Sequence, residues 1–137
     1  MYEKILVAID DSEAAGRVLA AAEELAMFSC GEVWLLHVWE GEPALYKSLS
    51  ARSFEDTLSW LKTAAEKMSA SGIDVHPVVV ANLYAYAARV IINFAAANEV
   101  GVIVMGSHGH NGVADLFVGN TTRKVIHLAD RPVIVVR

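Results

Sequence analysis

The chain has 137 residues, of which 55% are hydrophobic, and a formal net charge of -5. This length predicts one domain over residues 1–137. The acidic balance argues against a nucleic-acid partner, because phosphate backbones bind basic surfaces. No apolar run approaches the about 18 residues of a membrane span, and Asp10 interrupts the opening apolar segment too early for a secretory signal. Cys30 is the only cysteine, which excludes an intrachain disulfide and is typical of a cytoplasmic protein.

Short β-rich apolar segments alternate with longer segments of helical periodicity along the whole chain. This alternation predicts an α/β fold, in which βαβ units form a five-stranded parallel sheet with helices on both faces in three layers. The strand segments are nearly continuous in apolar residues, as expected for strands that are covered on both faces. They are expected at 4–9, 32–39, 74–80, 100–105 and 132–137.

Four helices are expected between these strands, each with an apolar stripe toward the sheet. The first covers about 12–29, and the second follows Ser53, whose spacing to Asp56 is that of a capping box. Glycines follow both helices and are available to end them. The third helix carries its inner face at Tyr84, Ala88, Ile91 and Ala95, and the fourth covers about 120–128.

Two loops at the carboxyl edge of the predicted sheet carry most of the polar chemistry. Ligands of open parallel sheets bind at this edge, where loops from neighbouring strands diverge. The first strand leads into Asp10, Asp11 and Ser12, and the fourth leads into a loop at 106–119 that contains several glycines. If these strands are adjacent, glycine amides, a helix N-terminus and threonine hydroxyls form a phosphate cradle opposite a carboxylate that suits ribose hydroxyls.

The same residues also have purely structural interpretations. Residues 10–12 can cap the first helix, and the glycines and threonines can be ordinary turn and first-turn residues. Their joint spacing favours the binding interpretation. The first strand is not followed by a P-loop, by a Gly-x-Gly-x-x-Gly fingerprint or by a His-x-Gly-His motif.

The histidines do not predict a metal or catalytic site. His108 and His110 have only Asp115 as a nearby acidic residue and no cysteine at ligand spacing. His37 lies inside a predicted strand, where a histidine is more often a hydrogen-bonded core residue than a catalyst, and His127 lies near the end of the last helix.

On these motifs, the chain resembles the universal stress protein family over essentially its whole length. Gly106, Gly109 and Gly119 match the glycine spacing of the family pattern Gly-x2-Gly-x9-Gly-Ser/Thr. The opening ILVAIDDS matches the Val-Ala-x-Asp-x-Ser start, and LLHV and RPVIVVR match the second and last strands. The resemblance implies a strand order of 3-2-1-4-5, a homodimer, and ATP, with or without Mg²⁺, between the loops after strands one and four.

By position, the resemblance also assigns roles to individual residues. Asp10 would bind ribose, while Ala8, Ile9 and Val38 would line an adenine pocket with Met105 nearby. The phosphates would be surrounded by Gly106, Gly109, Gly119, Asn120, Thr121 and Thr122, with His110 beside them.

The chain departs from the family pattern at three places. Asn120 follows the third glycine, where Ser or Thr is usual, and His110 stands where Lys or Arg is common. A mostly neutral His110 weakens the neutralisation of a triphosphate. Asn82-Leu83-Tyr84 replaces the usual Gly-x-Pro at the start of the third helix, so the adenine wall is expected to differ.

Three functions are compatible with this sequence. The favoured one is a regulatory stress-response module that binds ATP and hydrolyses it slowly at most, because no dedicated general base is visible. The second is a nucleotide-free homodimeric interaction module that regulates a transporter or a signalling partner. The third is a true ATPase or phosphotransferase in which Asp10 or Asp11 holds Mg²⁺. In each case the apolar last strand, expected at a sheet edge, predicts a two-fold dimer.

Overall fold

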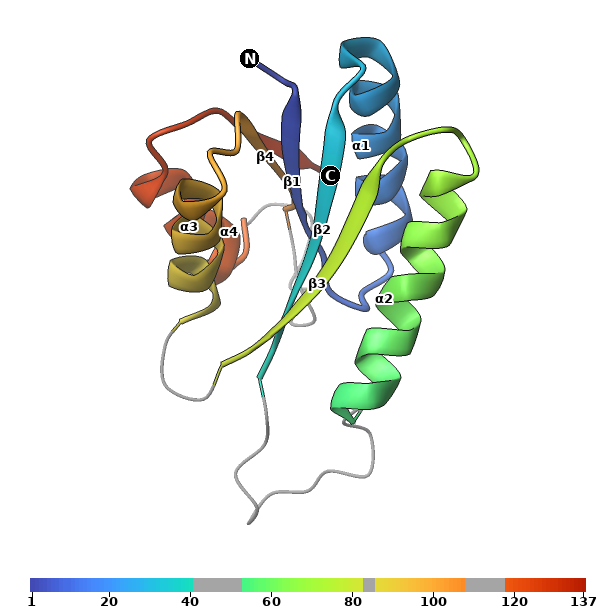
Figure 1. Ribbon diagram of the computed structural model, residues 1–137. Helices are drawn as coiled ribbons and strands as arrows, with labels where there is room; N and C mark the ends of the chain where they lie inside the picture. The colour runs from blue at the N-terminus through green and yellow to red at the C-terminus, as the bar shows by residue number, and fades with distance from the viewer. Residues whose placement is uncertain (41–52, 83–85, 108–117) are drawn as a thin grey trace.

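The computed structural model describes residues 1–40, 53–82, 86–107 and 118–137, which form an α/β fold (Figure 1). Its five parallel strands have the order β3-β2-β1-β4-β5. The predicted fold class, strand order and four helices are therefore confirmed. In chain order the elements are β1 (Lys4–Ala8), α1 (Ala15–Ser29), β2 (Glu32–Trp39), α2 (Phe54–Ser69), β3 (Val75–Ala81), α3 (Ala87–Ala97), β4 (Val102–Gly106), α4 (Asn120–Leu128) and β5 (Val133–Val136).

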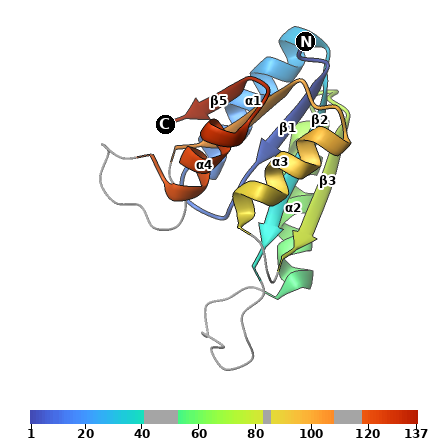
Figure 2. The same ribbon diagram turned by 90° about the vertical axis from the view of Figure 1, so that its left-hand side faces the viewer.

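Helices cover both faces of the sheet, with α1 and α2 on one side and α3 and α4 on the other (Figures 1 and 2). Successive strand side chains point to opposite faces, so β1 contributes to two cores at once. Ile5 and Val7 pack in the core cluster under α1 and α2, whereas Leu6 packs in the cluster under α3 and α4. All three are fully buried, which explains why the central strands are apolar at nearly every position.

The ends of the first two helices differ in how well the sequence predicts them. The Ser53 hydroxyl accepts the Asp56 amide at 3.1 Å, so the predicted cap of α2 is confirmed. The prediction that α1 begins at residue 12 is wrong, because residues 11–14 form a bend and turn, and Ala14 caps α1 without a side-chain hydrogen bond. At the other end of α1 the left-handed residue is Cys30, with φ of 52°, and not the glycine that follows it.

The apolar face predicted for α3 is confirmed at Ala88, Ile91 and Ala95, which are buried. Tyr84, the first residue predicted for this face, lies outside the described residues. None of the helices among the described residues combines the length and the apolar character that a bilayer crossing requires.

Candidate functional site

The carboxyl ends of β1 and β4 lie side by side at the centre of the sheet. Ala8 of β1 pairs with Met105 of β4. The next strand in the chain, β2, pairs with the other side of β1, whereas β5 pairs with the far side of β4. The loops that leave β1 and β4 therefore diverge, which is the arrangement that forms a ligand crevice in open parallel sheets. The predicted adjacency of these two strand ends is confirmed (Figure 1).

His37 fixes the chain just after β1. The Ile9 amide donates to the Leu36 carbonyl at 3.0 Å, and the Ile9 carbonyl lies 2.7 Å from His37 Nδ1. A carbonyl oxygen can only accept, so this contact selects the tautomer with the proton on Nδ1. The His37 ring also meets the Trp60 ring edge to face, at 5.4 Å between centroids. His37 is therefore hydrogen-bonded within the protein, as predicted.

Asp10 comes directly after this fixed residue. Its side chain is half-buried, and one carboxylate oxygen accepts the Ser12 amide at 3.1 Å. This hydrogen bond stabilises the turn that precedes α1 and orients the carboxylate at the carboxyl edge of the sheet.

Three hydrogen bonds hold the end of β4, two of them to the start of α4 and one to β5. The Gly119 amide donates to the Ser107 carbonyl at 2.7 Å, and the Ser107 amide donates to the Val136 carbonyl at 2.9 Å. The Thr122 hydroxyl donates to the Gly106 carbonyl at 2.7 Å. The start of α4 is thus held directly against the end of β4.

The first turn of α4 carries backbone amides that have no acceptor within the helix. The earliest amide that bonds back within the helix is that of Arg123, which donates to the Gly119 carbonyl at 2.9 Å. The amides of residues 120–122 consequently have no intrahelical acceptor, as at any helix N-terminus. They supply the positive end of the helix dipole beside the end of β4.

Most of the predicted site residues that the structure describes lie either at the start of α4 or against a core cluster. Gly119 is half-buried, and Asn120 and Thr121 are exposed at the start of α4, whereas Thr122 is only 4% exposed. Ala8, Val38 and Met105 pack in the core cluster under α3 and α4. Gly109 and His110 lie outside the described residues.

Ile9 is separated from the other apolar residues of this set. Its side chain is 7% exposed and belongs to the core cluster under α1 and α2, on the opposite face from Ala8. Both of its backbone polar groups are bonded within the protein, to Leu36 and His37. The structure therefore gives Ile9 a supporting position behind Asp10.

Sequence reasoning missed Ser107. This residue is 5% exposed, and its backbone joins β5, β4 and α4 through the two bonds described above. The sequence carries only a positional signal for it, namely a small residue directly after a glycine that ends a strand.

A model of the universal stress protein family matches residues 1–137. The chain belongs to the universal stress protein family. This universal stress protein is 30% identical over 153 residues to universal stress protein YxiE of Bacillus subtilis, covering 100% of both chains. It is also 30% identical over 143 residues to a universal stress protein of Thermus aquaticus, again covering 100% of both.

Solved structures resemble this universal stress protein over almost its whole length. Protein MJ0577 of Methanocaldococcus jannaschii superimposes with a TM-score of 0.82 at 28% identity, covering 99% of this chain and 96% of that one. A universal stress protein of Archaeoglobus fulgidus, solved in complex with dAMP, gives a TM-score of 0.72 at 25% identity and covers 99% and 98% of the two chains.

Proposed function

We propose that this universal stress protein binds an adenine nucleotide, ATP, between the ends of β1 and β4 and acts as a regulatory stress-response module. The observation that carries the proposal is the bond from the Gly119 amide to the Ser107 carbonyl, because it sets the N-terminus of α4 beside β4 and close to the strand that leads to Asp10. Amides without an intrahelical acceptor and a positive dipole end favour a bound phosphate. The dAMP complex of the Archaeoglobus fulgidus relative supports the choice of an adenine nucleotide.

The proposed phosphate ligands are the backbone and side chains around the start of α4. Asn120 and Thr121 are exposed there and contribute side-chain donors, together with the amides of residues 120–122. Gly106 and Gly109 would allow the phosphates to approach the chain closely. Thr122 would act indirectly, because its hydroxyl proton is already donated to the Gly106 carbonyl.

The proposed nucleoside contacts come from the β1 side. Asp10 would accept hydrogen bonds from the ribose hydroxyls, with its carboxylate oriented by the Ser12 amide. Ala8, Val38 and Met105 would form the apolar wall for adenine. None of these residues is assigned as a general base, so we expect hydrolysis to be slow at most, with Mg²⁺ accompanying the triphosphate.

Calorimetric titration with ATP and with adenosine tests this function. We expect Gly109→Val to lower the affinity for ATP at least about tenfold, or roughly 1.4 kcal/mol, and to leave adenosine binding nearly unchanged. Asp10→Ala is expected to weaken both ligands, and Glu13→Ala, at an exposed position in the same turn, should change neither. An unchanged ATP affinity in Gly109→Val, or no binding of millimolar ATP by the wild type, would favour a nucleotide-free interaction module.

We also propose that the protein is a cytoplasmic two-fold dimer that pairs through β5. Among the described residues this strand pairs with β4 alone, and Ile134 within it is 38% exposed. Ile126 and Leu128 at the end of α4 are 48% and 44% exposed, which adds apolar surface next to the edge. Cys30 is an exposed free thiol, in keeping with a reducing compartment.

Val135→Pro tests the dimer. The Pro132 and Val136 carbonyls accept the amides of Ile103 and Ser107, at the β4 side. By alternation along the strand, the Val135 amide therefore points toward the open edge. Proline there removes an edge donor without removing a bond between β4 and β5. We expect a monomer for this variant in sedimentation velocity, and a monomeric wild type at micromolar concentration would contradict the proposal.

A further inference from the structure

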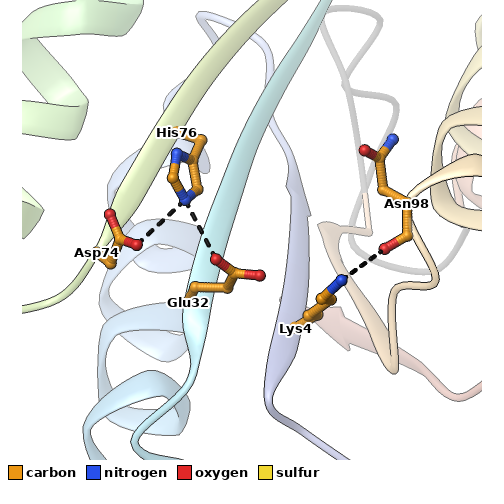
Figure 3. Close-up of polar contacts among 5 residues, drawn as sticks. All are labelled: Lys4, Glu32, Asp74, His76 and Asn98. Carbon is orange, nitrogen blue, oxygen red and sulfur yellow. Dashed lines mark hydrogen bonds and ion pairs between the residues drawn. The ribbon is translucent and has the colours of Figure 1, made fainter.

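A second polar cluster lies at the amino end of the strands, where β2 and β3 begin (Figure 3). This is the opposite end of the sheet from the proposed nucleotide site. His76 Nε2 lies 3.2 Å from Glu32 Oε2 and 3.3 Å from Asp74 Oδ2. The three ligand atoms all lie within 4.8 Å of one another. Nothing in the proposed nucleotide site uses these residues.

The strand register brings the three side chains together. Asp74 and His76 are two positions apart, so they project from the same face of the sheet. Val33 pairs with Val75 and Trp34 pairs with His76, which sets Glu32 of β2 beside Asp74 at the start of β3. The Val33 amide donates to the Asp74 carbonyl at 2.8 Å, so the backbone that carries the cluster belongs to the sheet itself.

The imidazole of His76 is held by packing. Its ring lies 4.5 Å from the Trp34 ring at an angle of 30°, and Trp34 meets Phe94 of α3 edge to face at 5.8 Å. The ring is therefore oriented by the core while Nε2 faces the two carboxylates (Figure 3).

The cluster has an excess of negative charge. Two carboxylates face one imidazole, so the three side chains carry a net negative charge even when His76 is protonated. Lys4 of β1 is in register with Glu32 of β2, but its ammonium group is directed to the Asn98 carbonyl, at 3.5 Å (Figure 3). A divalent cation between the three ligand atoms would balance the two carboxylates.

We propose that Glu32, Asp74 and His76 bind a divalent transition-metal ion of the Zn²⁺ type. Zinc bonds to histidine nitrogen and carboxylate oxygen are about 2.0–2.2 Å long, so two such ligands in a tetrahedral site are about 3.3–3.5 Å apart. The two nitrogen–oxygen distances in the cluster, 3.2 and 3.3 Å, are close to that spacing.

The ligand set also selects among metals. Imidazole nitrogen with carboxylate oxygen suits Zn²⁺, Co²⁺ and Ni²⁺, whereas Mg²⁺ and Ca²⁺ prefer oxygen ligands throughout. The side chains of His76 and Asp74 are 36% and 71% exposed, so the ion reaches the site from solvent and keeps at least one water ligand. An ion in this position links β2 to β3 and stabilises the folded chain.

Isothermal titration of the tag-free protein with Zn²⁺ tests the site. We expect one ion per chain, no binding of Mg²⁺ or Ca²⁺ at the same concentrations, and weaker Zn²⁺ binding at acid pH, because the ion must displace any proton on Nε2. His76→Ala and the conservative Asp74→Asn should each lower the affinity at least about tenfold. Asp74→Asn keeps the test valid if His76→Ala folds poorly.

The remaining histidines supply the controls. His127→Ala and the double variant His108→Ala/His110→Ala should bind Zn²⁺ as the wild type does. Equal affinity in the wild type and His76→Ala, or loss of binding in the double variant alone, would overturn the proposal. So would the absence of Zn²⁺ binding by the wild type, which is the result expected if His76 only forms ion pairs with Glu32 and Asp74.

Trp34 offers a fluorescence readout of metal binding that does not depend on calorimetry. Because its ring contacts His76, bound Ni²⁺ should quench its fluorescence in a Trp39→Phe/Trp60→Phe background, and adding His76→Ala should abolish the quenching. The nucleotide experiments use the other edge of the sheet, so either proposal can fail without the other.

Discussion

Replacing Thr122 with valine tests how the start of α4 is held against β4. Valine has nearly the same shape as threonine, but it cannot donate the 2.7 Å hydrogen bond to the Gly106 carbonyl. Removing the donor to a buried acceptor costs about 1–3 kcal/mol. Thr122 is 4% exposed but Gly106 is half-buried, so water can replace part of the bond and we expect the lower half of that range. For a domain of this size that corresponds to a fall in Tm of roughly 3–8 °C.

Thr121→Val is the matched control, because the neighbouring threonine is exposed. Its unfolding free energy should stay within about 0.5 kcal/mol of the wild type, while its affinity for ATP falls if the Thr121 hydroxyl contacts phosphate. Urea unfolding followed by circular dichroism, without nucleotide, compares the three proteins. A Thr122→Val variant as stable as the wild type would refute the assigned role of the Gly106 bond.

Three further predictions concern stability away from the site. Ser53→Ala removes the α2 cap and should cost about 1 kcal/mol in urea unfolding. Gly31→Ala would bring a new Cβ within 2.5 Å of the Tyr2 carbonyl oxygen, so it should destabilise by about 1–3 kcal/mol in the same assay. A hydrogen bond from Arg131, and then its charge, lowers the pKa of the Asp130 carboxyl below 3.8. The stability that wild type gains over Asp130→Asn should therefore be present above pH 3.8 and disappear as the pH falls further, which urea midpoints at several pH values would show.

The architecture was predictable because each layer leaves a periodic trace in the sequence. Strands that are buried on both faces are apolar at nearly every position, and the helices between them are apolar on one stripe. The strand order came from the family resemblance, since hydrophobic periodicity does not say which strands are neighbours. The start of α1 was mispredicted because the Asp10 carboxylate accepts the Ser12 amide in a turn. This side chain, which resembles a helix cap in the sequence, therefore bonds within the turn before the helix.

The candidate metal cluster shows what periodicity cannot reveal. His76 and Glu32 are 44 positions apart, and each looks like an ordinary residue near a strand end. Only the register of β2 against β3 brings them within 3.2 Å. Sequence reasoning considered His108 and His110 for metal binding because they are close in sequence, which is a weaker guide than strand pairing.

The proposed nucleotide site illustrates the same limit among donors. Thr121 and Thr122 are equivalent in the sequence, but only packing shows that the Thr122 hydroxyl is committed to Gly106 while Thr121 is exposed. The backbone amide and carbonyl of Ile9 are likewise already hydrogen-bonded, to Leu36 and His37. Fewer side chains are thus available to a ligand than the motif suggests, and phosphate binding would depend mainly on the amides at the start of α4. Those amides are positioned by the hydrogen bond from the Gly119 amide to the Ser107 carbonyl. We therefore expect the geometry of this bond to control the affinity for phosphate more than any one side chain that lines the site.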